Sequence, residues 1–505
     1  MNKRIPISLT IAIAAVIPSG AQSPGSSFDE FRAGILNGYS SFRNSVLENY
    51  DKFLDGVWTE YESFKGLKSD TTPKPVSAPK ADTTPVVKDS TPVPAPVADK
   101  PAHRPEPKPA PKPKPAPQPQ PAPETGPTPS PVVSHPAEDT APFRFDFYGM
   151  EMQIPDIEIR ITERLSSTKD FGRQWRDLSK SGSGHSIVPE LKKLASRLQL
   201  NDYLTYELTR DYVNGRYPQA HSTGRMSLIH FILANMGYDA RIGMTNNGHA
   251  ILLLPFNQQV YARPFMSIDN RTYYVFADKD IDLENPANMR ITTCQLPKDA
   301  ETGASLELRL TPLNLPYKAQ PFSLKAAGLE VNGELNANIL PVIYRYPQMP
   351  MGEYAQSEIL PDIRRSVVEQ LKPQVADMTE HEAVDALLHF TQNAFEYSRD
   401  DAFHGFEKPY FFEETLFYPK CDCEDRAIFY TYLLWHVLGV ENQLINYPGH
   451  ESASVRLSEP IKGDYYDHKG TRYYISDPTY IGSSSGMCMP TYRHQAPTVD
   501  HTYSH

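Results

Sequence analysis

Cysteine is scarce in this sequence of 505 residues. It has four cysteines, so a framework of disulfide bonds is not what holds so long a chain together. Basic residues are also few: 50 Lys and Arg against 61 Asp and Glu give a net charge of −11, without a basic block. Nucleic acid is therefore not expected as a partner. The 27 glycines follow no period, which excludes a collagen-like structure.

Long apolar runs are missing too. The apolar stretch of residues 5–17 is too short to span a bilayer, and no second one follows, so we expect no transmembrane segment. Lys3 and Arg4 precede this stretch, and the small residues Ser19-Gly20-Ala21 follow it. Residues 1–21 therefore read as a secretory signal peptide, which predicts an exported protein, periplasmic or extracellular.

Proline is concentrated in one segment. Of the 48 prolines, 23 lie between Thr71 and Pro142. Such a stretch favours polyproline II over helix or central strand, so residues 67–142 are expected to be a disordered linker. A passive spacer is the favoured interpretation, and a docking site for proline-binding domains is the alternative.

Residues 28–66 carry apolar side chains that repeat every eleven residues, or 3.67 residues per turn. This period keeps one apolar stripe on a nearly straight helix. The stripe has to be buried, either by docking on the rest of the chain or by self-association. A membrane-surface helix is the alternative, against which the local excess of acidic residues argues. The columns of the repeat are Phe28, Tyr39, Tyr50 and Tyr61; Phe31, Phe42, Phe53 and Phe64; and Ile35, Val46 and Val57.

The motif richest in chemistry lies near the C-terminus. An apolar run at helical spacing, residues 428–438, follows the acidic segment that contains Cys423. Asp422 is a candidate N-cap, with Asp425 three residues further on as in a capping box. Cys423 then falls in the first turn of a helix, where the helix dipole favours a thiolate. Glu424 and Asp425 oppose this effect, so another positive group is needed.

A histidine can be that group. Gly449-His450 precedes an alternating run, residues 451–457, and a second strand pattern, residues 472–476, ends at Asp477. A thiol at a helix start, an imidazole on one strand and a carboxylate on the next could converge. The thiol would attack, the imidazole would take and return a proton, and the carboxylate would orient the ring. Cys423, His450 and Asp477 are therefore the candidate catalytic residues.

Three segments together resemble the transglutaminase-like superfamily of papain-like cysteine enzymes, above all its exported bacterial members. The segments are Cys423-Glu424-Asp425-Arg426-Ala427, Gly449-His450 and Asp477-Pro478-Thr479, with equal intervals of 27 residues from Cys to His to Asp. Residues 394–397 and 414–416 are similar to the family's approach to its nucleophile, and the resemblance covers residues 382–492. It implies a cysteine-bearing helix packed on an antiparallel sheet that carries His and Asp. It also implies acyl transfer through a thioester, either hydrolysis of an amide or its exchange with an amine.

One residue departs from the family pattern. Cys421 stands where a small or hydroxylated residue is more usual. It could bring unwanted redox chemistry, pair with Cys488 or be an inert small residue, and the inert interpretation is favoured. Cys294 is expected to be a buried apolar residue.

The middle of the chain repeats the same layout about 200 residues earlier. Residues 228–236 form an apolar run closed by a glycine, Gly248-His249 precedes a strand pattern, and residues 272–278 echo residues 471–477. The offset places His221 opposite Cys423, with Ser222 beside it. The copy is therefore expected to be degenerate and to serve packing or substrate binding, and a serine nucleophile at Ser222 is the alternative.

These observations predict an α+β protein with two transglutaminase-like modules, the first degenerate, and a small β region between them. The expected boundaries are 1–21 for the signal, 28–66 for the amphipathic helix, 67–142 for the linker, 143–294 for the degenerate module, 295–372 for the β region, 373–492 for the catalytic domain and 493–505 for a solvated tail.

The expected function is an exported cysteine peptidase or amidase that acts on a peptide or protein substrate. Water is the default acceptor outside the cell, so hydrolysis is favoured over crosslinking. No cofactor and no metal site are expected, because the other histidines lack ligand spacing. The alternative is a non-catalytic binding or scaffold protein of the cell envelope built on the same fold.

Overall fold

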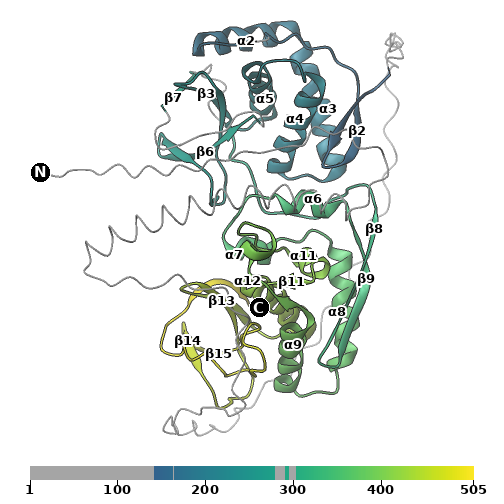
Figure 1. Ribbon diagram of the computed structural model, residues 1–505, viewed down its shortest axis with the longest axis vertical. Coiled ribbons are helices and arrows are strands. Elements are labelled where there is room, and N and C mark those ends of the chain that lie inside the picture. Colours follow the sequence, from purple (N-terminus) through teal and green to yellow (C-terminus); the bar gives the residue numbers. More distant parts are fainter. Residues whose placement is uncertain (1–140, 163, 279–289, 295–302) are drawn as a thin grey trace, which may run out of the picture.

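The fold is mixed α and β and contains two curled sheets (Figure 1). It is known from a computed structural model that describes residues 141–162, 164–278, 290–294 and 303–505. The expected signal peptide, eleven-residue repeat and proline-rich linker lie outside the described residues. Within the described part, no helix combines the length and the apolar character that a membrane span requires.

The first unit begins with a hairpin and continues with four helices. The hairpin turn is Tyr148-Gly149, and both residues have positive φ (52° and 83°), as a two-residue turn between twisted strands requires. The helix α5 is buried on nearly all sides and packs against β3 and β4. The elements are β1 (Phe143–Phe147), β2 (Met150–Ile154), α2 (Thr168–Ser181), α3 (Ser183–Leu198), α4 (Asp202–Arg216) and α5 (Ser222–Met236).

The sheet of the first unit is antiparallel, with the order β5-β6-β4-β3-β7. Its central strand β4 is buried along its whole length: one face belongs to the core with the helices, and the other packs among side chains of the same curled sheet. The strands are β3 (Arg241–Thr245), β4 (Ala250–Leu254), β5 (Phe265–Ile268), β6 (Arg271–Ala277) and β7 (Ile291–Thr293).

A long hairpin and two short helices connect the units. Figure 1 shows this hairpin running beside α8. Gln370 and Gln374 of α8 each accept a backbone N–H of β9, at 3.1 and 3.0 Å, and donate to its carbonyls, so they close an open sheet edge. The elements are β8 (Ala319–Ala326), β9 (Leu329–Asn336), α6 (Ile339–Tyr344) and α7 (Met351–Gln356).

The second unit places helices against another antiparallel sheet, with the order β14-β15-β13-β12-β16. Its helix α12 packs on β12 and β13, as α5 packs on β3 and β4. The helical elements are α8 (Pro361–Val375), α9 (Glu380–Ala394), α10 (Asp400–Phe403), α11 (Phe412–Phe417), α12 (Cys423–Leu433) and the π-helical turn η3 (Leu434–Leu438). The strands are β10 (Glu396–Tyr397), β11 (Lys420–Cys421), β12 (Asn442–Tyr447), β13 (His450–Val455), β14 (Tyr465–His468), β15 (Thr471–Ile475) and β16 (Thr498–Tyr503).

The expected internal repeat is present as topology. Strand for strand, the two sheets have the same order, and each follows a helix that ends in a glycine with positive φ: Gly237 at 105° and Gly439 at 69°. The units also share a core, because Phe411, Ala427 and Leu444 belong to the same apolar cluster as the first unit's helices.

The expected β region contains the hairpin β8–β9, whereas the expectation of a solvated tail is wrong. Within this region, residues 306–310 alternate like a strand but form only an isolated bridge from Leu306 to Phe256. Their leucines still enter the core alternately, because an extended chain alternates its side chains even without strand neighbours. Residues 493–505 are not a solvated tail, since β16 pairs with β12 and extends the second unit to Tyr503.

One buried ion pair fixes α8 to α11. Arg364 and Glu413 are 2 % and 0 % exposed and form two hydrogen bonds, of 2.7 and 2.9 Å. Glu413 also accepts the backbone N–H of Leu360 at the start of α8. Both oxygens of Glu413 are therefore engaged, and removal of the arginine would strand a buried charge.

We expect Arg364→Met to lower the free energy of unfolding by about 3–5 kcal/mol, because Glu413 would lose its counter-charge. The double variant Arg364→Met, Glu413→Leu should recover much of this loss, because it leaves no unpaired buried charge. Urea unfolding followed by circular dichroism measures both. Equal stability of Arg364→Met and the wild type would contradict the prediction.

Candidate active site

The helix that carries Cys423 starts where the sequence predicts. Cys423 is the first residue of α12, and Asp422 is its N-cap. The Asp425 carboxylate accepts the backbone N–H of Asp422 at 3.2 Å, which is the returning half of the expected capping box. It also accepts the N–H of Tyr410 at 2.7 Å. A fully buried carboxylate thus ties the start of α12 to the loop before α11.

A second buried residue anchors α12 from the opposite side. The Arg426 guanidinium donates to the carbonyl oxygens of Phe395 (2.9 Å) and Gln392 (3.3 Å) at the end of α9. Cations suit helix C-termini, where carbonyl groups lack partners inside the helix. The first turn of α12 is therefore held at a fixed place between α9 and α11.

His450 and Asp477 are brought together as expected. His450 opens β13, and Asp477 follows β15. His450 Nε2 lies 2.8 Å from Asp477 Oδ2, and both side chains are buried. The other Asp477 oxygen accepts the N–H of Thr479 at 2.9 Å. The ring of Tyr492 stacks on that of His450, with centroids 5.0 Å apart and 11° between the planes.

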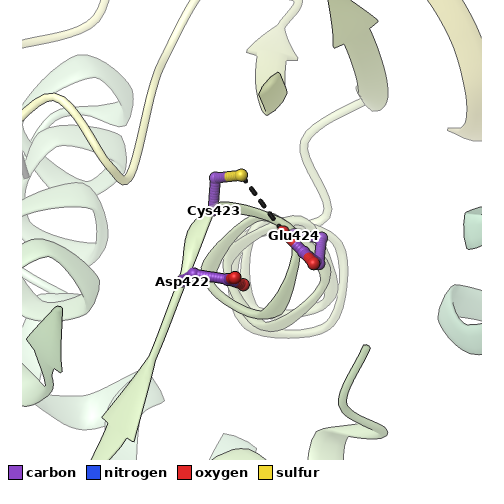
Figure 2. A group of neighbouring side chains, drawn as sticks. All are labelled: Asp422, Cys423 and Glu424. Carbon is purple, nitrogen blue, oxygen red and sulfur yellow. Dashed lines mark hydrogen bonds between the residues drawn. The ribbon is translucent and has the colours of Figure 1, made fainter. Parts of the chain in front are cut away.

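The Cys423 thiol faces the same end of β13. It interacts with the backbone N–H of Glu451, the residue after His450, and electrostatically with Tyr492, which stacks on His450. Its side-chain hydrogen bond, however, runs to Glu424 Oε2 at 3.1 Å (Figure 2). His450 and Asp477 are therefore in contact, whereas the Cys423 thiol lies near the residue that follows His450 and is hydrogen bonded to a neighbouring carboxyl group.

Carboxyl groups crowd the thiol. Three groups of three side chains each have their ligand atoms within 4.8 Å of one another, and the Cys423 sulfur belongs to one of these groups. Burial and mutual repulsion raise the pKa of Glu407 to about 7, of Glu424 to about 8 and of Asp400 to about 10. The groups are Asp422 with Cys423 and Glu424, Asp400 with Glu407 and Glu424, and Asp400 with Asp422 and Asp425.

Two states of this cluster are chemically reasonable. Carboxylate oxygens are the ligands of hard divalent cations such as Ca²⁺ or Mg²⁺, so one could be held by Asp400 with Glu407 and Glu424, or by Asp400 with Asp422 and Asp425. The same carboxyl groups can instead retain protons at neutral pH, as their raised pKa values indicate. Sequence reasoning missed the cluster, because Asp400 and Glu407 belong to no recognisable motif and only folding places them beside α12.

The thiol is not activated in the way that the helix start suggests. Burial raises the pKa of Cys423 well above its usual value, the charges of Glu424 and Asp422 raise it further, and only the Glu451 N–H opposes them. The helix dipole is thus outweighed by desolvation and like charge. A neutral thiol that gives up its proton during the reaction fits this environment better than a stable thiolate.

The other cysteines are unpaired. All four are free thiols, so Cys421 and Cys488 do not form a disulfide. Cys421 is 1 % exposed, and burial strongly raises its pKa, which agrees with the inert interpretation. Cys294 is only partly buried, and burial raises the pKa of its thiol to about 12.

Gln392 and Tyr492 are further residues of the site that the sequence did not reveal. The Gln392 amide donates to carbonyl oxygens of Asp477 (3.3 Å), Tyr480 (3.0 Å) and Ser483 (3.1 Å), and accepts the N–H of Gly482 at 3.0 Å. It holds the loop that carries Asp477. Gln392 lies between two other polar residues near the end of α9, so its sequence context carries no signal.

The first unit has a corresponding but different group. His221 is the N-cap of α5 and lies in the electrostatic reach of His249 and Asp278. The Asp278 carboxylate, however, is bound by Arg225 at 2.7 and 2.9 Å. The carboxylate that orients His450 in the second unit is here paired with an arginine, which supports the degenerate interpretation.

Comparison with known proteins identifies no relative. No protein-family model matches the chain, and no curated protein matches it. The resemblance to transglutaminase-like enzymes therefore remains an interpretation of the motifs.

We expect Glu424→Gln to lower the pKa of the Cys423 thiol, because it removes a negative charge next to the sulfur. The effect should show above about pH 8, where Glu424 of the wild type carries its charge. The rate of iodoacetamide alkylation of Cys423 as a function of pH, resolved by peptide mapping, measures the shift.

The matched control is Glu396→Gln. This carboxylate is exposed and paired with Lys420, so its removal should leave the alkylation profile unchanged. A Glu424→Gln profile that coincides with the wild type, or moves to higher pH, would show that Glu424 does not set the thiol pKa.

Proposed function

We propose that this protein is a cysteine-dependent acyl-transfer enzyme that hydrolyses peptide or amide bonds through a thioester on Cys423. The observation that carries the proposal is the buried His450–Asp477 hydrogen bond of 2.8 Å, beside a cysteine at a helix start. Export of the enzyme, expected from residues 1–21, remains part of the proposal.

The Asp477 contact assigns the two nitrogens of His450. A carboxylate only accepts hydrogen bonds, so Nε2 carries the proton and Nδ1 of the neutral ring is left as the base. Asp477 also stabilises the imidazolium that forms when Nδ1 takes the thiol proton. The parallel ring of Tyr492 keeps the imidazole in one plane.

In the proposed first step, the Cys423 sulfur attacks the carbonyl carbon as its proton passes to His450. The tetrahedral intermediate then collapses: the C–N bond breaks, the leaving amine takes the proton from His450, and a thioester remains. Water, deprotonated by His450, cleaves the thioester and returns the thiol. Because the resting thiol is neutral, attack and proton transfer are coupled.

The oxyanion needs two donors. One is the backbone N–H of Cys423, which lies in the first turn of α12 and has no partner within the helix. The second is the hydroxyl of Tyr397, whose environment includes the Cys423 sulfur. The Arg426 guanidinium lies 5.7 Å from the centre of the Tyr397 ring, and this positive charge strengthens the hydroxyl as a donor.

The raised pKa of Cys423 favours a second candidate function. A thiol that donates a hydrogen bond to Glu424 and is surrounded by acidic groups could belong to a protein that binds without reacting. A binding or scaffold protein of the cell envelope is therefore the competing proposal. The two differ in whether Cys423 reacts faster than an ordinary thiol.

We expect Cys423→Ala and His450→Ala each to lower hydrolysis of dimethylated casein by about 10³-fold or more, since each removes a reacting group. Asp477→Asn should cost less, because Asp477 orients the ring and does not react. Peptide mapping after iodoacetamide treatment should find the label on Cys423 and a slower reaction in His450→Ala.

Two variants serve as controls. Cys421→Ser should keep wild-type turnover, because Cys421 is buried and unreactive. Ser222→Ala should keep it too, because the carboxylate of that unit, Asp278, is paired with Arg225. Unchanged turnover in Cys423→Ala, or a label on Cys421, would refute the assignment. Casein hydrolysis that no variant alters would favour the binding protein.

A separate prediction concerns Tyr397. Tyr397→Phe removes the hydroxyl and keeps the ring, so it should lower kcat by about 10²-fold with little change in KM. The label on Cys423 should form at the wild-type rate, because alkylation builds no oxyanion. A loss of labelling equal to the loss of kcat would instead mean that Tyr397 acts on the thiol.

A further inference from the structure

A separate cavity lies between the two units. Its volume is about 570 Å³, and its lining includes neither Cys423 nor His450 nor Asp477. The helix α4 and the end of β6 contribute one side, and α6 and α10 contribute the other. Cavities between packed units and of this size are typical places for small ligands.

Aromatic side chains form the wall on the side of the first unit. Tyr206 and Phe276 meet edge to face, with ring centroids 5.2 Å apart, and Tyr203 lies 5.9 Å from Tyr206. Tyr203 and Tyr206 are only 4 % and 2 % exposed. This wall offers a rigid surface to a flat or apolar group.

The carboxylates of α4 are already engaged by the protein. Arg210 donates to Glu207 at 2.6 Å and to Asp211 at 3.0 and 3.1 Å. Tyr148, in the β1–β2 turn, donates its hydroxyl to Glu207 at 3.0 Å. These acidic groups are thus part of a network that shapes the cavity.

Arg263 differs from Arg210 in having no counter-charge. Its guanidinium carbon lies 4.1 Å from the centre of the Phe276 ring, and its one hydrogen bond with described residues is a long contact of 3.4 Å to the carbonyl of Val275. No described carboxylate pairs with it. The hydroxyl of Tyr203 also has no hydrogen-bond partner among the described residues. The donors available to a ligand therefore include the Arg263 guanidinium over Phe276 and the Tyr203 phenol; the exposed Arg345 also lines the cavity.

We propose that this cavity binds a small organic carboxylate with a flat or apolar body. Arg263 receives the carboxylate through its planar fork, since stacking on Phe276 leaves the N–H edge free. The Tyr203 hydroxyl supplies a further donor, and Tyr206 contacts the body. A free peptide C-terminus and an acidic sugar both carry this chemistry. The site is independent of the proposed activity, because binding needs none of the catalytic residues.

The test is isothermal titration calorimetry on the full-length chain. The probes are an N-acetylated dipeptide ending in phenylalanine, as free acid and as C-terminal amide, and digalacturonate. We expect at least one of the two acids to bind. If the dipeptide acid binds, its affinity should be about 10-fold or more higher than that of its amide. The tighter of the two acids identifies the source of the carboxylate.

Variants locate the binding. Arg263→Gln should weaken the binding of the acid about 10-fold or more and leave any binding of the amide unchanged, and Arg263→Lys should fall in between, because it keeps the charge and loses the fork. Tyr203→Phe should cost a smaller factor. Arg365→Gln, at an exposed pair on α8, is the matched control and should bind like the wild type.

Three results would overturn the proposal. The first is that neither acid binds at millimolar concentration, and the second is that a folded Arg263→Gln variant binds the acid with unchanged affinity. The third is equal affinity for the dipeptide acid and its amide when digalacturonate does not bind. Circular dichroism of each variant confirms that it is folded. Loss of casein hydrolysis in Cys423→Ala with unchanged acid binding would separate this site from the proposed active site.

Discussion

The buried carboxylate of Asp425 is the group on which the geometry of the site depends. It has no exposed surface, and it binds the backbone N–H groups of Asp422 and Tyr410. These two contacts set where α12 begins, and the start of α12 sets where the Cys423 sulfur lies. A buried carboxylate is costly unless it is hydrogen bonded, so the chain has little freedom to begin this helix elsewhere. The residue at which α12 starts is thus set by the need to hydrogen bond the buried Asp425 carboxylate rather than by helix propensity.

The same acidic surroundings that fix the helix disfavour ionisation of the Cys423 thiol. Each carboxyl group near Cys423 disfavours ionisation of the thiol and of its neighbours, and burial adds to both effects. The protons of this region therefore form one coupled set. The hydrogen bond of His450 runs to Asp477, whereas that of the thiol runs to Glu424. A reaction that begins from a neutral thiol is consistent with this division between acidic groups and base.

Much of this arrangement could be predicted from the sequence, for reasons that differ between residues. The α12 start followed from capping chemistry, and β13 and β15 followed from alternation after Gly449-His450 and before Asp477, because these patterns are local. Asp400 and Tyr492 could not be predicted, since only tertiary packing brings them to the site. The alternating leucines of residues 306–310 lie in an extended segment and not in one of the sheets, because alternation indicates an extended chain and a strand also needs hydrogen-bonded neighbours. The prediction of a solvated tail failed because β16 is mostly polar and pairs at a sheet edge.

The two units show how one topology can carry different chemistry. Both sheets have the same strand order. Both place a histidine near the start of a central strand and an aspartate after the neighbouring strand of the sheet. In the first unit Arg225 binds one oxygen of Asp278, and the N-cap is His221 rather than an aspartate before a thiol. The same topology thus places different partners around the corresponding aspartate. The cavity lies between the first unit and the helices of the second, and the two units share one apolar core.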